Sequence, residues 1–174
     1  MINSDTIPEY CSKEVLVLGC GNILLGDDGF GPSVIEYLLT KERKLDNVCF
    51  LDVGTSSRDI LFDVVLSEKK PRKIVVVDAM DYGGTPGAMT ELSLDAIPYN
   101  KIDDFSMHQV PTSNLLRELR DLCKVEVVLI VCQPAEIPDE VKPGLSIPVQ
   151  QAVKKAAEVV LKGCLPEPIE DLKE

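Results

Sequence analysis

Glycine and aspartate dominate one short stretch of the chain, which lies between a strand-like segment and a helical pattern. The stretch is GCGNILLGDDGFG at 19–31, and it follows the apolar residues 15–18. Glycine allows sharp turns and close approach of a ligand or another backbone segment. Open α/β sheets place their ligand sites at strand-to-helix turns of this kind. Two adjacent acids, Asp27 and Asp28, further indicate that the turn holds a metal or a positive charge.

Apolar segments of strand type alternate with segments of helical periodicity along the chain. Continuous or β-branched apolar runs predict strands at 15–20, 48–53, 73–79, 88–94 and 125–132. Apolar residues at helical spacing predict helices at 31–44, 59–68, 113–122 and 147–161, with Ser56 or Ser57 capping the second. This alternation predicts a three-layer α/β/α sandwich with a mostly parallel, five-stranded twisted sheet. We expect one domain at 1–163 and a loose acidic tail at 164–174.

Composition narrows the classes of partner. The 174 residues carry a formal net charge of −11, which argues against nucleic acid because phosphates require a basic face. Neither a membrane-spanning apolar run nor a secretory signal is recognisable, so we expect a cytoplasmic protein without a membrane partner. The six cysteines are scattered and include no CxxC pair. Their simplest interpretation is as reduced thiols of the core.

Several acids and one amide stand at or just after the ends of the predicted strands. The carboxyl ends of parallel strands meet at one edge of a sheet. This rule gathers Asp27, Asp28, Asp52, Asp78, Gln133 and Glu136 at that edge. The single histidine, His108, lies in a segment that leads into a predicted helix, and that segment could bring it to the same edge.

Asp28, Asp78 and His108 together fit a divalent metal site. Imidazole suits zinc, nickel and iron, and carboxylates suit many ions. Each residue also has a structural interpretation, because Asp28 and Asp78 could cap a helix or turn and His108 could be an ordinary loop histidine. Asp27 is interpreted first as a turn-forming residue.

Two other kinds of site are disfavoured by the same stretch. Dinucleotide binding requires a third glycine where Leu24 stands, and Asp27 and Asp28 would repel a pyrophosphate at the helix start. A cysteine hydrolase would use Cys20 as nucleophile and His108 as base. No basic residue near Cys20 in the sequence would lower the pKa of its thiol.

The motif Gly19-x-Gly21-Asn22-x-Leu24-x-Gly26-Asp27-Asp28-Gly29-x-Gly31 resembles the N-terminal signature of nickel–iron hydrogenase maturation endopeptidases. The resemblance runs from about 15 to 161 and includes the segments DVGT at 52–55, VVDA at 76–79, GTPG at 84–87 and MHQ at 107–109. Segments 108–111 and 133–136 are most similar to the branch that serves coenzyme-F420-reducing hydrogenases of methanogens. Asp28 stands where the family often has Glu.

The resemblance implies an endopeptidase that removes a C-terminal extension from the precursor of the hydrogenase large subunit after nickel insertion. It implies that Asp28, Asp78 and His108 are both catalytic and metal-contacting residues, in an enzyme of aspartic or metal-dependent type. The implied metal is nickel presented by the substrate precursor, with no organic cofactor. The glycines 19, 21 and 54 would let the precursor tail approach. The alternative is a non-catalytic maturation chaperone that binds nickel or the precursor on the same scaffold.

Overall fold

The computed structural model describes residues 8–41, 45–97 and 110–164. Its centre is a five-stranded sheet in the order β2-β1-β3-β5-β4. The strands are β1 (Val15–Cys20), β2 (Val48–Gly54), β3 (Lys73–Ala79), β4 (Met89–Leu92) and β5 (Glu126–Cys132). β1, β2, β3 and β5 run parallel to one another, and β4 pairs antiparallel with β5 at the sheet's edge. The mostly parallel sheet predicted from the sequence is therefore confirmed.

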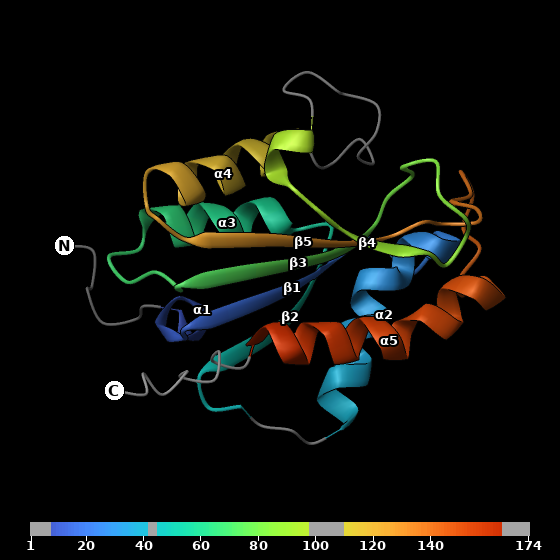
Figure 1. The fold of residues 1–174 in the computed structure, drawn as a ribbon, viewed down its shortest axis with the longest axis horizontal. Coiled ribbons are helices and arrows are strands. Elements are labelled where there is room, and N and C mark those ends of the chain that lie inside the picture. Colours follow the sequence, from blue (N-terminus) through green and yellow to red (C-terminus); the bar gives the residue numbers. More distant parts are fainter. Residues whose placement is uncertain (1–7, 42–44, 98–109, 165–174) are drawn as a thin grey trace, which may run out of the picture.

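Helices cover both faces of the sheet and make the expected three layers (Figure 1). α2 (Phe30–Thr40) and α5 (Ile147–Cys164) pack together on one face, and α3 (Ser57–Leu66) and α4 (Val110–Asp121) pack together on the other. Three short elements complete the described chain: α1 (Glu9–Ser12) and the 3-10 helices η1 (Gly26–Gly29) and η2 (Leu94–Ala96). Among the described residues, no helix is long and apolar enough to cross a membrane.

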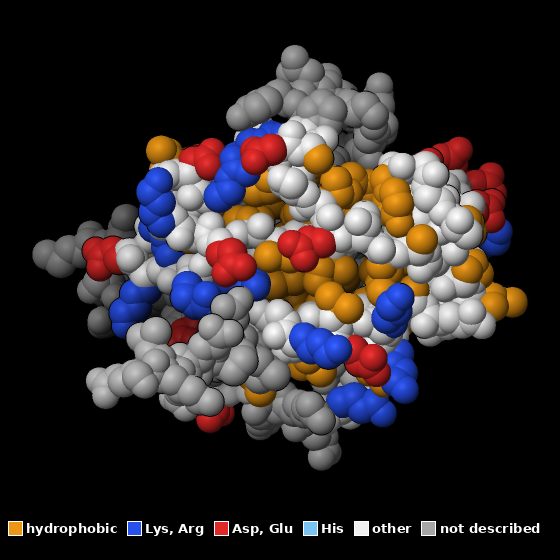
Figure 2. All heavy atoms as spheres, in the orientation of Figure 1, with side chains coloured by type: hydrophobic (Ala, Val, Ile, Leu, Met, Phe, Trp, Pro, Cys, Tyr) orange, Lys and Arg blue, Asp and Glu red, His pale blue; other side chains and the backbone are white. Residues whose placement is uncertain are grey.

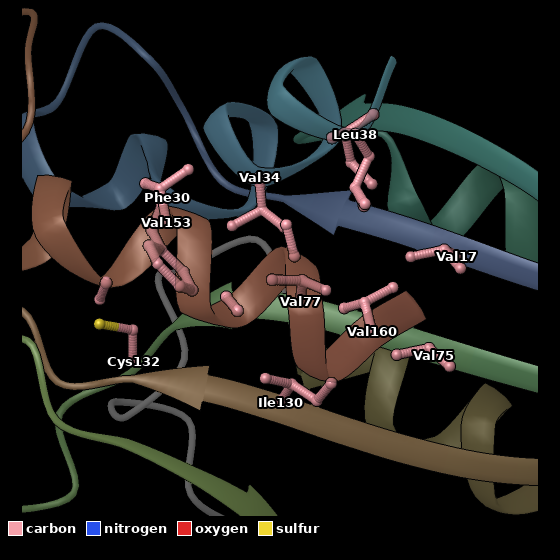
Figure 3. Packing of buried hydrophobic residues seen from close by; sticks show 14 of the residues in the cluster. Val17, Phe30, Val34, Leu38, Val75, Val77, Ile130, Cys132, Val153 and Val160 are labelled. Atoms are coloured by element: carbon pink, nitrogen blue, oxygen red, sulfur yellow. The ribbon is translucent and has the colours of Figure 1, made fainter. Parts of the chain in front are cut away.

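Side chains of the central strands point alternately to the two faces of the sheet and pack into two separate hydrophobic cores. Val17, Val75 and Val77 point toward α2 and α5, where they meet Phe30, Val34 and Val153 (Figure 3). Leu16, Leu18, Ile74 and Val76 belong to the second core, with Leu61 of α3 and Leu119 of α4. Burial on both faces explains why β1 and β3 are continuous apolar runs rather than alternating ones.

Glycine lets α2 start directly on top of the sheet. A Cβ atom at Gly31 would lie 2.3 Å from the carbonyl oxygen of Cys20 and 2.4 Å from that of Val77. Since real side chains do not approach backbone so closely, only glycine permits this contact. The start of α2 is therefore held against the ends of β1 and β3, and the preceding residues of η1 lie over the same strand ends.

Some element boundaries differ from the sequence expectation. β4 is shorter than 88–94, and α2 ends at Thr40 rather than near 44. Ser56 stands at the N-cap of α3 and Ser57 is the helix's first residue, but the Ser56 side chain makes no capping hydrogen bond, so the predicted cap is wrong. α5 continues to Cys164, which is buried. The remaining tail, 165–174, lies outside the described residues.

Candidate functional site

The register of the sheet places the ends of β1, β2 and β3 at one edge. Gly19 pairs with Asp52 of β2 and with Val77 of β3, so Asp78 stands level with Cys20. The glycine-rich loop leaves β1 at this edge and carries Asp28 back over it. Asp28 and Asp78 thus come from segments fifty residues apart in sequence but lie at the same edge, as the strand-end rule predicted.

Asp28 is buried in η1, two residues before the start of α2. One of its carboxylate oxygens, Oδ2, accepts a hydrogen bond of 2.8 Å from the backbone N–H of Asn22. The loop closes this tightly because Gly21 has a φ of +122°, and a Cβ there would lie 1.9 Å from the backbone oxygen of Asp28. A side chain at position 21 would therefore push Asp28 away from the strand ends.

Asp78 is the last buried residue of β3. Its Oδ1 accepts a hydrogen bond of 2.8 Å from the backbone N–H of Ala79. The four residues before it, 74–77, are all buried apolar side chains. Asp78 is therefore a carboxylate held in place by a rigid central strand, the kind of element that positions functional groups most accurately.

The thiol of Cys20 lies among these carboxylates. Burial raises the pKa of Cys20 well above its usual value, the charge of Asp78 raises it further, a hydrogen bond from Ser57 opposes the rise, and Asp52 and Asp28 add to it. An activated cysteine nucleophile requires the opposite shift. The direction of this shift disfavours the cysteine-hydrolase interpretation, and Cys20 is a buried thiol of the second core.

Asp27 differs from its neighbour in that its carboxylate contacts the connection that follows β5. Its carboxylate accepts four hydrogen bonds: from the backbone N–H groups of Ala135 (2.7 Å), Glu136 (3.2 Å) and Ser146 (2.6 Å), and from the Ser146 hydroxyl (2.8 Å). These partners belong to the connection between β5 and α5. Asp27 therefore fastens the glycine-rich loop to that connection, and it does more than form a turn.

The other acids and the amide predicted at this edge have local roles. Asp52 is exposed and accepts from the N–H of Gly54, and Glu136 is exposed and forms an ion pair of 2.8 Å with Lys142. The buried Gln133 accepts from the N–H groups of Tyr82 (3.0 Å) and Gly84 (2.9 Å) through Oε1 and donates to Asp81. The N–H of Gly83 and the Gln133 amide lower the pKa of Asp81. Gln133 therefore holds the loop that follows β3.

His108 lies outside the described residues, so its place relative to Asp28 and Asp78 stays a prediction. Within 8–41, 45–97 and 110–164, no group of three or more His, Cys, Asp or Glu side chains is arranged to hold a metal ion. What this part of the chain does supply is two buried carboxylates at one edge, and carboxylate oxygens are ligands for many divalent cations.

At two of the three glycines expected to admit a substrate, the space that a side chain would take is filled by other parts of the protein. A Cβ at Gly19 would meet the Ile35 side chain at 2.5 Å, and one at Gly21 would meet the backbone of Asp28. Both glycines therefore allow close packing within the chain, and their expected role in admitting the precursor tail stays a prediction. A Cβ at Gly54 would lie 3.7 Å from the backbone oxygen of Gly21, which is an ordinary van der Waals contact.

Comparison with known proteins identifies the family. Residues 32–163 match the family model described as hydrogenase maturation protease. A putative hydrogenase maturation protease of Methanocaldococcus jannaschii is 42% identical over 151 residues, which cover 86% of this chain and 95% of the relative. The coenzyme F420 hydrogenase subunit delta of Methanothermobacter thermautotrophicus is 40% identical over 153 residues, covering 85% and 92%.

Solved structures give the same assignment at the level of the fold. The hydrogenase maturating endopeptidase HybD from E. coli superposes with a TM-score of 0.70 at 28% identity, covering 86% of this chain and 91% of that one. A hydrogenase 2 maturation peptidase from the Thaumarchaeota archaeon SCGC_AB-539-E09 has a TM-score of 0.60 at 30% identity, covering 87% and 97%. This chain belongs to the hydrogenase maturation protease family.

Proposed function

We propose that this chain is an endopeptidase that removes the C-terminal extension of a nickel–iron hydrogenase large-subunit precursor after nickel insertion. The observation that supports the proposal best is the pair of buried carboxylates, Asp28 and Asp78, at one edge of the sheet in a member of this family. The 40% identical relative named as a subunit of coenzyme F420 hydrogenase makes a hydrogenase of that class the first precursor to test.

The metal in this proposal arrives with the substrate, held in the precursor. Asp28, Asp78 and His108 would contact it, since carboxylate and imidazole donors suit divalent first-row metals. Such a metal can polarise a peptide carbonyl and lower the pKa of a bound water. In a second version of the mechanism, one of the two carboxylates acts as general base on water, and the metal serves only to recognise the precursor. Either way, a precursor without nickel leaves the site incomplete and is not cut.

In both versions, backbone groups of this chain orient the two carboxylates. The N–H of Asn22 orients the Asp28 carboxylate, and the N–H of Ala79 orients that of Asp78. Burial at the strand ends keeps both carboxylates largely out of bulk water. Their interaction with a cation is stronger there than in water, because the surroundings screen charge less. Asp27 and Gln133 hold the loops on either side of this edge.

The decisive experiment incubates the purified protein with nickel-loaded precursor and follows the mass of the large subunit. Asp28→Asn, Asp78→Asn and His108→Ala are each expected to slow processing by about 100-fold or more, the range typical for loss of an acid–base or metal-contacting group. Asp59→Asn is the control, because Asp59 is an exposed carboxylate in the first turn of α3. Far-ultraviolet circular dichroism checks that every variant is folded.

The outcomes separate the two candidate roles. Normal processing by Asp78→Asn would contradict the assignment of this site. Tight binding of the precursor with no change in its mass would instead identify a maturation chaperone. A parallel reaction with nickel-free precursor tests whether the metal arrives with substrate, and a metal analysis of the purified protein tests whether one is already resident.

A further inference from the structure

Four apolar side chains are exposed on the two loops beside the candidate site. Ile23 is 58% and Leu24 46% exposed in the glycine-rich loop, and Ile137 is 40% and Val141 71% exposed in the β5–α5 connection. We call these four residues the rim patch. An exposed apolar cluster bordered by polar residues is typical of an interaction surface.

Backbone hydrogen bonds join the two loops into one surface. The N–H of Lys142 donates to the oxygen of Leu24 at 2.8 Å, and the N–H of Gly26 donates to the oxygen of Lys142 at 2.9 Å. Leu25 and Lys142 thereby form a parallel bridge, which sets Leu24 beside Val141 in register. Pro138 packs against Gly26, since a Cβ there would lie 2.9 Å from its Cδ. The backbone of the rim patch is therefore held in place by contacts between the two loops.

Exposed acidic residues flank the rim patch on the β5–α5 connection. Glu136, Asp139 and Glu140 are exposed on the same connection, and Lys142 is paired with Glu136. Figure 2 shows a group of acidic side chains at the right-hand end of the molecule, with a basic side chain beside it and apolar ones below, where Figure 1 draws this connection beyond the ends of the strands. A partner for such a surface would be apolar at its centre and carry lysine or arginine around it.

The rim patch is continuous with the candidate site. Ile23 directly follows Asn22, whose N–H binds the Asp28 carboxylate. A groove of about 530 Å³ is lined by Ile23, by residues of α2 that include Pro32 and Leu39, and by Asp52 of β2. A protein seated on the patch would therefore be next to Asp28, with room for its side chains in the groove.

We propose that the rim patch is the surface on which the folded body of the hydrogenase large-subunit precursor docks, through apolar side chains bordered by basic ones. The inference rests on the proposed function, because it takes that precursor as the partner. Docking here adds affinity and selectivity for the precursor separately from the chemistry at Asp28 and Asp78.

The first test removes apolar surface without changing charge. Ile23→Ser/Val141→Ser is expected to raise KM for the nickel-loaded precursor by about tenfold, with kcat at saturation retained, as for residues central to an interface. The Kd for the precursor, measured in an Asp78→Asn background, should rise by a similar factor. Leu66→Ser and Leu122→Ser are matched controls, because these residues are 68% and 74% exposed but lie at the ends of α3 and α4 away from this edge.

The second test changes charge alone. Asp139→Lys/Glu140→Lys is expected to slow association with the precursor and to reduce the dependence of its rate on salt. Glu158→Lys, an exposed acid on α5, is the control and should change neither quantity.

The outcomes keep this inference apart from the proposed function. Unchanged Kd and KM in Ile23→Ser/Val141→Ser would overturn the docking surface even if processing is normal. Loss of a homodimer in that variant, with precursor binding intact, would also overturn it, because the patch would then bind a second copy. Conversely, weakened precursor binding in that variant would support the docking surface even if no cleavage is observed and the endopeptidase proposal fails.

Discussion

Two neighbouring aspartates in this chain have different structural roles. Asp27 accepts four hydrogen bonds from the β5–α5 connection and is buried. In Asp27→Asn, the amide N–H₂ would face backbone N–H donors and leave some of them unpaired. We expect a loss of about 3 kcal/mol in the free energy of unfolding, measured by urea denaturation. Asp52→Asn, at an exposed site, should change it by less than about 0.5 kcal/mol, and an equally small change for Asp27→Asn would contradict the fastening role.

At the scale of single residues, the sequence predicts which side chains lie at the sheet edge better than it predicts their hydrogen-bond partners. The strand-end rule placed Asp28 and Asp78 at one edge, because that follows from parallel pairing alone. It did not reveal what Asp27 does, since the partners of its carboxylate are Ala135, Glu136 and Ser146, more than 100 residues away. Gln133 was placed at the edge for the same reason as Asp78, but its hold on the 81–84 loop is a tertiary contact that no local pattern encodes.

The contact of α2 with the sheet gives a prediction at the scale of elements. Gly31→Ala would insert a Cβ within 2.4 Å of two backbone oxygens, so α2 would have to move away from β1 and β3. We expect a destabilisation of about 3 kcal/mol, measured by urea denaturation. Gly163→Ala is the control: it lies in α5, where the nearest atom to a new Cβ is the Lys73 Nζ at 4.0 Å. Helix propensity favours that change by about 0.5–1 kcal/mol, and equal effects at the two sites would contradict the packing argument.

Strand and helix positions and the mostly parallel sheet were largely predictable, but the direction of β4 and the capping of α3 were not. The bounds of β1 and β3 agree with the apolar runs because both strands are buried on both faces. The same runs carry no information on direction, so the antiparallel pairing of β4 with β5 was not foreseen. Ser56 occupies the cap position of α3 without capping it. A suitable residue type is therefore not sufficient for a cap, since the side chain must also adopt the required geometry.

At the scale of the whole molecule, both cores contain buried cysteine thiols. Cys132 belongs to the core under α2 and α5, Cys20 to the core under α3 and α4, and Cys164 closes α5. Burial, followed by the charge of Asp27, raises the pKa of Cys132 to about 12, and burial raises that of Cys164 to about 11. These shifts make the stability of the whole fold depend on pH in a definite direction.

The folded state keeps these thiols protonated at pH values where the unfolded chain releases their protons. Each pKa rises from about 9 on folding, so the contribution to stability is complete below pH 9 and is lost as pH rises toward 11 and 12. We expect the free energy of unfolding, measured by urea denaturation under reducing conditions, to decline progressively above pH 9. Cys132→Ala should be less stable at neutral pH, because it leaves a cavity, but should decline with a shallower slope. An identical slope in that variant would show that the Cys132 thiol does not couple folding to pH.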